Sequence, residues 1–339
     1  MLGALFGGTF LLFTCALLLG STPIPLAQVL HAIFDTGPVP SQVHTIVWEV
    51  RLPRAVTALA AGAALGLAGL TMQTLLRNPL AEPYILGVSS GTSLGVAVVV
   101  LVSGAGTAAF TGGLDVTGRA GTVLAAAIGA TAVMALMLTL ARWTRSVVTL
   151  LIIGVMVGSA VSALVNVLVI YAEPRQIQQF VLWGMGSFSG TTWPDIAWLL
   201  PVLAGGTLAS LALMKPLNAL LLGETYARTM GVNVRLVRWL AILIASVLAG
   251  TVTAFCGPVA FLGLAVPHLT RIALGSADHR VLMPATLLMG GGVAVLCGTA
   301  ATMPGTSAVL PLNSVTALIG APIVIAVLLR GRTVQGAAS

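Results

Sequence analysis

The chain has 339 residues, of which 58% are hydrophobic and only 7% are charged, whereas soluble domains usually carry roughly 25% charged residues. This composition excludes a soluble globular protein, since no soluble core could enclose so much apolar surface, and it predicts an all-α polytopic membrane protein. The net charge of +7 does not indicate nucleic-acid binding, because the basic residues lie singly between apolar runs and form no basic face.

The N-terminal apolar segment could be mistaken for a signal peptide. It lacks a basic n-region and an obvious small-x-small cleavage site, so it is expected to form a first membrane span. The absence of positive charge at this end is unusual, and it leaves open a true start further upstream.

Apolar runs separated by charges, prolines and glycines predict about ten crossings, because about 20 helical residues cover the hydrocarbon core of a bilayer. The second run shows the pattern most clearly, since Arg51-Leu52-Pro53-Arg54 precedes it and Arg77-Asn78-Pro79 follows it. The eighth run is expected to be kinked or broken, because glycine and proline crowd it. The chain is interpreted as a single transmembrane domain, residues 1–339. Its spans lie at roughly 4–20, 55–76, 84–103, 120–141, 147–171, 195–214, 236–256, 258–274, 281–301 and 313–329.

The distribution of basic residues orients these spans. With a cytoplasmic N-terminus, the basic residues divide 11 to 4 between the cytoplasmic and the outer loops, and shifting the count by one span would spoil this split. Both termini are then cytoplasmic. Arg51 and Arg54 lie outside against the trend, which points to a function for them. The other outer residues are Arg119 and Arg175, and the cytoplasmic ones are Arg77, Arg142, Arg145, Lys215, Arg228, Arg235, Arg238, Arg271, Arg280, Arg330 and Arg332.

The chain carries no evident energy source of its own. Its single lysine, Lys215, is not part of a G-x-x-x-x-G-K-[ST] loop, so any ATP that drives transport must be hydrolysed by another subunit. Ion-coupled carriers usually place ionisable groups near the bilayer midplane. Here Asn166 is the main polar group inside a span, and Glu82, His268 and Arg271 fall nearer the span ends. An ion-coupled secondary transporter is disfavoured but stays open as an alternative.

Two short patterns could suggest chemistry. Residues 87–91 match the G-x-S-x-G nucleophile elbow, but this segment opens a membrane helix and not a strand-to-helix turn. His268 has no second ligand at metal-binding spacing, and Cys15, Cys256 and Cys297 lie singly in apolar runs. No catalytic residue, metal site or cofactor is predicted.

Glycine pairs with small-x-x-x-small spacing predict close helix packing inside the membrane, where no hydrophobic effect drives helices together. Three such pairs occur, Gly62/Gly66, Gly91/Gly95 and Gly154/Gly158.

The longest cytoplasmic loop, residues 215–235, has its own helical pattern. Gly223 interrupts it, Glu224 to Met230 is expected to form a short helix, and Gly231 is a helix-stop signal. Two short helices joined at a glycine form a projection that could dock into a groove on a cytoplasmic partner. The alternative, a surface loop resting on its own protein, stays open.

These segments together resemble the FecCD family of ABC-importer permeases, which includes permeases for cobalamin, iron–siderophores and haem. The resemblance covers nearly the whole chain, and its order over ten spans makes it specific. The residues that carry it are Arg51-Leu52-Pro53-Arg54, residues 69–88, Leu182-Trp183-Gly184-Met185-Gly186-Ser187, residues 223–231, residues 257–264, Pro267-His268-Leu269-Thr270-Arg271 and residues 315–322.

The resemblance implies a type II ABC importer permease. It would work in a dimer of permeases, with two ATPase subunits beneath and a periplasmic substrate-binding protein above. Arg51 and Arg54 resemble the outward arginines that pair with glutamates of the binding protein. Val147 and Val148 resemble the cytoplasmic gate. The residues that resemble the helices coupled to the ATPase are Leu222, Gly223, Glu224, Ala227, Arg228, Met230 and Gly231.

One departure from the family pattern concerns the last outer loop. Family members carry an acidic residue, then an arginine, then Glu-Leu-Pro-Val-Gly, and the aligned positions here are Gly298, Thr302 and Val309-Leu310-Pro311-Leu312-Asn313. The charges missing here suggest a non-identical second permease that supplies them, with a homodimer as the alternative.

The expected function is uptake of a metal chelate across the bacterial cytoplasmic (inner) membrane, with no chemistry performed by this chain. An iron–siderophore is the first expectation for the substrate, and haem or cobalamin comes next. The resemblance implies that the binding protein largely sets this choice.

Overall fold

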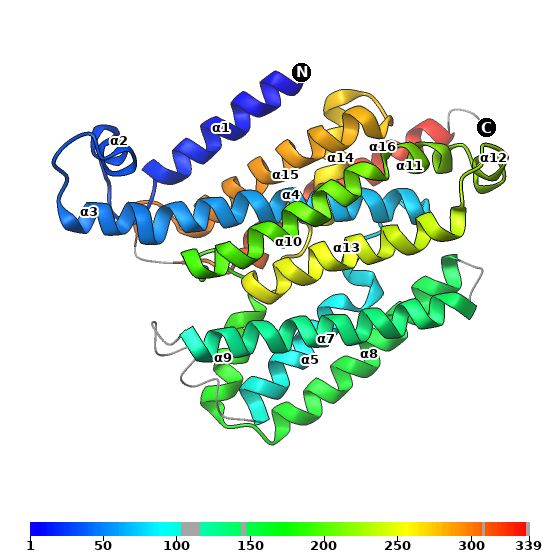
Figure 1. Ribbon diagram of the computed structural model, residues 1–339, viewed down its shortest axis with the longest axis horizontal. Coiled ribbons are helices and arrows are strands. Elements are labelled where there is room, and N and C mark those ends of the chain that lie inside the picture. The colour runs from blue at the N-terminus through cyan, green and yellow to red at the C-terminus, as the bar shows by residue number, and fades with distance from the viewer. Residues whose placement is uncertain (103–115, 144–146, 307–308, 337–339) are drawn as a thin grey trace. The chain divides into compact units, whose positions relative to one another are not determined.

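The computed structural model describes residues 1–102, 116–143, 147–306 and 309–336, and it is helical along these ranges (Figure 1). Within this part of the chain, six helices are long and apolar enough to cross a membrane, and four more apolar helices are shorter. Together they occupy the ten predicted positions. They are α1 (Leu2–Leu18), α4 (Leu52–Leu76), α5 (Val88–Ala97) with η3 (Val98–Val102), α7 (Val116–Trp143), α8 (Val147–Ile170), α10 (Trp193–Ala212), α13 (Val234–Cys256), α14 (Leu262–Leu274), α15 (His279–Ala301) and α16 (Leu312–Gly336).

The second span begins earlier than predicted. α3 (Ser41–Thr45), the π-helical η1 (Ile46–Arg51) and α4 form one run, Ser41–Leu76. Pro53 lies just inside α4, and its ring cannot donate to the carbonyl one turn back. A π-helical turn directly before it absorbs this missing hydrogen bond and lets the helix continue.

Shorter helices connect the spans. α2 (Leu26–Phe34) precedes the second span, and η2 (Pro83–Leu86) precedes α5. α9 (Pro174–Gly184) follows α8 and begins with a capping box, in which Glu173 and Gln176 exchange hydrogen bonds with each other's backbone. α11 (Met214–Leu221) and α12 (Glu224–Thr229) follow α10.

The described chain divides into two compact units, and α4 and α10 each contribute to both. Unit 1 comprises residues 1–70, 187–204 and 259–339. In it α1 packs against α15, and α14 packs against α15 and α16. α4 and α15 meet at Gly62 and Gly290, where a Cβ on either glycine would overlap the carbonyl of the other. The predicted close approach at Gly62 is therefore confirmed.

Unit 2 comprises residues 71–186 and 205–258. Here α5 packs against α7, α8 and α13 (Figure 1). Gly91 lies against the carbonyl of Gly129, and Gly95 lies against that of Ala125, so the second predicted glycine pair also permits a close helix approach. The prediction of one functional transmembrane domain over residues 1–339 stays a prediction.

The predicted break in the eighth span is confirmed. Only 13 residues, Leu262–Leu274, are helical there, and Pro267 lies inside them. Phe261 has a φ of 68°, a left-handed conformation that side chains rarely adopt. The side chain of Asn313 stabilises this turn, because its Oδ1 accepts a hydrogen bond of 2.9 Å from the backbone N–H of Ala260.

Candidate functional site

The segment between α10 and α13 folds as the sequence predicts. α11 ends at Leu221, α12 spans Glu224–Thr229, and Gly231 follows with a φ of 81°. Gly223 joins the two helices with φ 118° and ψ 149°, a conformation that is essentially restricted to glycine. The glycine therefore sets the direction in which α12 leaves α11.

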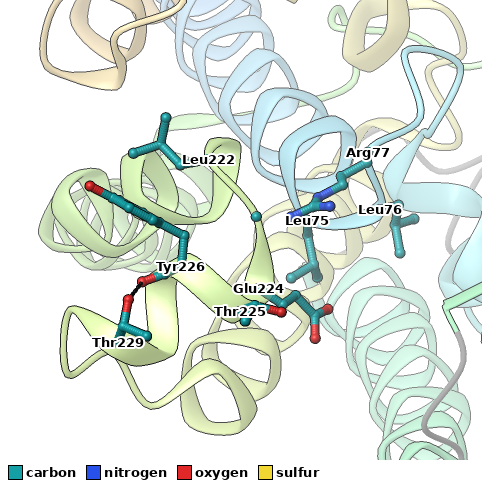
Figure 2. Close-up of a pocket in the computed structure, with 9 residues that line it drawn as sticks. Leu75, Leu76, Arg77, Leu222, Glu224, Thr225, Tyr226 and Thr229 are labelled. Atoms are coloured by element: carbon teal, nitrogen blue, oxygen red, sulfur yellow. Dashed lines mark hydrogen bonds between the residues drawn. The ribbon is translucent and has the colours of Figure 1, made fainter.

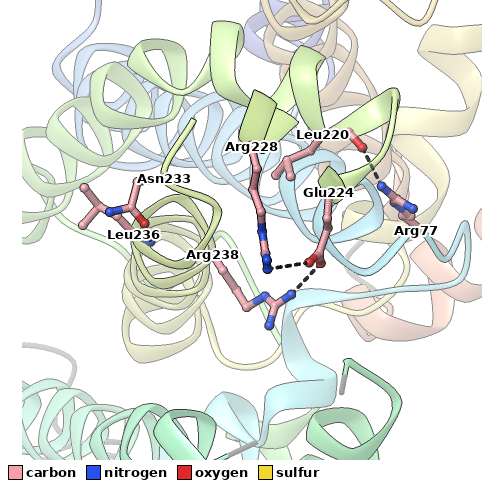
Figure 3. Close-up of polar contacts among 7 residues, drawn as sticks. All are labelled: Arg77, Leu220, Glu224, Arg228, Asn233, Leu236 and Arg238. Carbon is pink, nitrogen blue, oxygen red and sulfur yellow. Dashed lines mark hydrogen bonds and ion pairs between the residues drawn. The ribbon is translucent and has the colours of Figure 1, made fainter. Parts of the chain in front are cut away.

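Polar contacts hold α12 against its own unit (Figure 3). Arg238 of α13 donates from Nη2 to Oε1 of Glu224 at 2.6 Å, while Nη2 of Arg228 lies 3.7 Å from the other carboxylate oxygen. The first contact is partly shielded, since the Arg238 side chain is 19% exposed, whereas that of Arg228 is 69% exposed. Only the Arg238 pair is thus expected to contribute appreciably to positioning α12.

A second contact joins this segment to the end of α4. Arg77 follows α4 and donates from Nη2 to the carbonyl of Leu220 at 3.0 Å. This carbonyl belongs to the last turn of α11, where backbone acceptors have no partner within the helix. The guanidinium therefore caps α11 and ties it to α4.

A hollow of about 740 Å³ separates the end of α4 from α12 (Figure 2). Leu75, Leu76 and Arg77 line one side. The Gly223 turn and the first residues of α12 line the other. Leu222, Tyr226 and Met230 are each more than half exposed, whereas Ala227 is fully buried. The predicted coupling residues thus divide into an exposed apolar set and a set that anchors the segment.

Arg51 is only 3% exposed. Its guanidinium donates to the carbonyls of Leu17, Leu18 and Thr22, and it lies over Gly20, which has no side chain to obstruct it. These carbonyls belong to the end of α1 and the turn after it, so Arg51 caps that helix from a distance of more than thirty residues along the chain.

Arg54 is 8% exposed, and its Nη2 has no hydrogen-bond partner within the described residues. A buried guanidinium with an open donor is costly unless something pairs with it. The two predicted docking residues therefore differ, since Arg51 is satisfied by its own chain and Arg54 is not.

The remaining predicted residues lie at helix ends and turns. Val147 and Val148 are the first residues of α8, where the structure describes the backbone only. Gly298 lies in α15 against the ring of Phe188, and Thr302 follows that helix, with its hydroxyl donating to the carbonyl of Thr299. Neither position holds a charge.

Sequence reasoning missed the roles of Arg77, Arg238 and Asn313. Nothing local marks Arg238 or Asn313, because their partners lie 14 and 53 residues away. Arg77 carries a local signal, since an arginine directly after an apolar run is a common helix-end residue. Its partner, the carbonyl of Leu220 in α11, has no local sequence signal.

Known proteins resemble this chain over most of its length. The FecCD transport family matches residues 8–330. The vitamin B12 import system permease protein BtuC of Klebsiella pneumoniae is 37% identical over 290 residues, which cover 84% of this chain and 83% of the relative. The cobalamin import system permease protein BtuC of Halobacterium salinarum is 36% identical over 321 residues, which cover 93% of this chain and 82% of the relative.

A solved structure, described as an inward-facing conformation of a metal-chelate type ABC transporter, matches the fold with a TM-score of 0.83 at 28% identity. The match covers 97% of this chain and 98% of that one. These likenesses confirm an all-helical, multi-pass permease that performs no catalysis and works with an ATPase and a binding protein. The chain therefore belongs to the FecCD transport family of ABC-importer permeases.

Proposed function

We propose that the chain is the permease subunit of a cobalamin importer. The observation that carries this proposal is the 36% identity to a cobalamin permease over 93% of the chain, together with the similar identity to a vitamin B12 permease from Klebsiella pneumoniae. These relatives favour cobalamin, an alternative in the sequence analysis, over the iron–siderophore that was expected first. Cobalamin is itself a metal chelate, which agrees with the description of the matched structure.

The α11–α12 segment is proposed to transmit the ATPase cycle to the spans. The exposed side chains of Leu222, Tyr226 and Met230 supply an apolar surface for a cleft of the ATPase subunit, and Glu224 and Arg77 connect the segment to α13 and α4. In this proposal the segment and both termini lie on the cytoplasmic side of the inner membrane, in agreement with the positive-inside count. Val147 and Val148 remain the proposed cytoplasmic gate.

The opposite side is proposed to receive the substrate-binding protein. Arg51 ends η1 and Arg54 lies in the first turn of α4, but the donors of Arg51 are engaged by α1. Arg54 is therefore the better candidate to meet a carboxylate of the binding protein, with Arg51 holding the end of α1 in place beside it. Docking through Arg54 requires the partner to reach a guanidinium that is mostly covered.

The proposed second permease is a different chain. Thr302 and Gly298 lack the charges that the family pattern places in the last outer loop, so two copies of this chain would present a weaker docking surface. A non-identical permease that carries those charges would restore it, and a homodimer is the alternative.

The test is uptake by the complete transporter in proteoliposomes. The chain, the second permease, the ATPase and the binding protein are reconstituted, and radiolabelled cyanocobalamin, a ferric siderophore and haem are compared. Cyanocobalamin should accumulate only with ATP inside and binding protein outside, and an ion gradient without ATP should drive none. Accumulation of the siderophore or haem but not of cobalamin would overturn the substrate assignment. Uptake by the chain alone would overturn the ABC mechanism.

A further inference from the structure

A second hollow, of about 480 Å³, lies within unit 2 between α8 and the junction of η2 with α5. The hydrogen-bonding residues Tyr84, Ser90, Ser159, Ser162 and Asn166 line it, together with small residues of α8 and Gly87. The carbonyl of Gly154 and the N–H of Gly158 come within ordinary contact of where a Cβ of Gly87 would be. Glycine on α8 leaves this space open, so the third predicted glycine pair lines a hollow.

Four polar side chains of this hollow differ from most threonines in the spans. Threonines on the spans return their hydroxyl to the carbonyl one turn back, as Thr92 does to Val88, Thr253 to Ala249 and Thr286 to Leu282. By contrast, Ser90, Ser159, Ser162 and Asn166 have no side-chain hydrogen-bond partner among the described residues. Ser159, Ser162 and Asn166 are exposed and Ser90 is partly buried, so four polar groups without a partner in the described chain converge on one space.

Such a surface is incompatible with lipid. In hydrocarbon an unsatisfied amide or hydroxyl is costly, and polar residues in spans accordingly face protein or a water-filled cavity. α8 is otherwise apolar, and Ser159, Ser162 and Asn166 project from one side of it because residues spaced by three, four or seven share a helix face. This side of α8 is therefore expected to meet water or a polar ligand.

We propose that this hollow is a solute-contact site on the transport path, which takes neutral hydrogen-bonding groups of the transported chelate. The lining residues include hydroxyls, a phenol and an amide, but none that is charged. Such a set offers donors and acceptors to primary amides and hydroxyls without a preference for carboxylates. The proposal rests on the importer function proposed above and narrows its substrate class, since the rim of cobalamin carries primary amides.

The volume of the hollow limits how much of the solute it can contact. At about 480 Å³ it admits one edge of a large chelate and not the whole molecule. Hydrogen bonds from a few groups to one edge give a weak contact, which suits a passage because a solute that binds too tightly does not leave. Filling of the hollow by the second permease is the competing outcome.

The first experiment measures access from water. Cys15, Cys256 and Cys297 are replaced by alanine, and single cysteines are placed at Ser159 and Ser162. Each variant is assembled with the second permease, the ATPase and the binding protein in proteoliposomes. Leu164→Cys is the matched control, because at about 100° per residue it lies on the opposite side of α8 from Ser162. A membrane-impermeant methanethiosulfonate should modify the two hollow positions about tenfold faster than the control, since thiolate forms in water and not in lipid.

Cobalamin-loaded binding protein and ATP should slow the modification of Ser162→Cys and leave Leu164→Cys unchanged. Equal modification rates at all positions, or faster modification of Leu164→Cys, would contradict the proposal that the hollow is a solute-contact site. Modification that depends on removing the second permease would assign the hollow to the interface between permeases instead.

The second experiment tests whether the solute forms hydrogen bonds with the side-chain amide of Asn166. Asn166→Leu should lower cobalamin uptake about tenfold with unchanged ATPase assembly, whereas Asn166→Gln should retain most uptake. Equal uptake by both variants would contradict the contact. If the wild-type importer moves another chelate instead of cobalamin, the proposed function fails, but the cysteine rates still decide whether the hollow lies on its path.

Discussion

At the scale of single residues, two neighbouring arginines have different surroundings. Arg51 gives its donors to three backbone carbonyls at the end of α1, whereas Arg54 keeps a buried donor without a partner in the described part of the chain. Hydrogen bonds from a charged group contribute about 1.5–3 kcal/mol each, and removing the donor leaves the acceptors unpaired. The same residue type is thus expected to stabilise the fold at one position and to serve recognition at the other.

We expect Arg51→Ala to lower the stability of the purified permease by about 2 kcal/mol or more, because α1 loses its cap. Thermal unfolding in detergent measures this. Arg54→Ala should unfold as the wild type does but bind the binding protein about tenfold more weakly in a surface-binding assay. Arg175→Ala, at an exposed arginine of α9, is the control for a general loss of charge. Equal stability of the Arg51 and Arg54 variants would contradict this division of roles.

Gly223 allows a second prediction at this scale. Its backbone lies in a region that residues with a Cβ rarely enter, so Gly223→Ala should misdirect α12 at a cost of about 1–3 kcal/mol. The variant should lose ATPase co-purification while its spans stay folded, as judged by circular dichroism. Gly205→Ala in α10, where an added Cβ meets nothing, should behave as the wild type. Normal ATPase binding by Gly223→Ala would argue against a defined α11–α12 angle.

At the scale of helices, α12 is short and has little stability of its own. Isolated helices need about 12–15 residues to be even marginally stable in water, so contacts with neighbours must hold its six residues in place. Ala227 supplies the buried side, and the Glu224–Arg238 pair fixes the helix to α13. A helix held this way moves together with the span that holds it.

Arg238→Met should therefore uncouple the transporter. Uptake per ATP hydrolysed is expected to fall about fivefold or more, while the ATPase still binds and hydrolyses, because the mechanical link weakens before the docking surface does. Arg228→Met removes the weaker, exposed partner of the same carboxylate and should have little effect. The ratio of cobalamin uptake to phosphate release, measured in proteoliposomes, distinguishes the two. A similar loss in both variants would rule out a specific link through α13.

At the scale of the whole molecule, the chain is one part of a larger assembly. In the proposed function it supplies the path and the coupling segment, and its family implies that the ATPase and the binding protein are separate. In and just before its last outer loop, Gly298, Thr302 and Val309 lack the charges of the family pattern. The charge of the docking surface for the binding protein therefore depends on which permease pairs with this chain.

Purification of the untagged complex from its native membrane tests that pairing. We expect two different permease chains in equal amounts, with two ATPase copies, in quantitative mass spectrometry. Introducing an arginine by Thr302→Arg should then increase affinity for the binding protein when this chain is the only permease present. A native complex with one permease species would favour the homodimer.

The sequence by itself determined the ten apolar helices, the break before α14 and the turn at Gly223. Each follows from local rules, because a span in lipid must satisfy its backbone within one helix and glycine or proline interrupts it at a known position. Even α9 was within reach, since the Glu173-Pro174 start with Gln176 is a helix-start signal. Only the tertiary structure decided that Arg51 caps α1, that Arg238 holds Glu224 and that Asn166 shares a hollow with Ser90. Their partners are distant in the chain, and which polar groups meet depends on helix packing that no local pattern encodes.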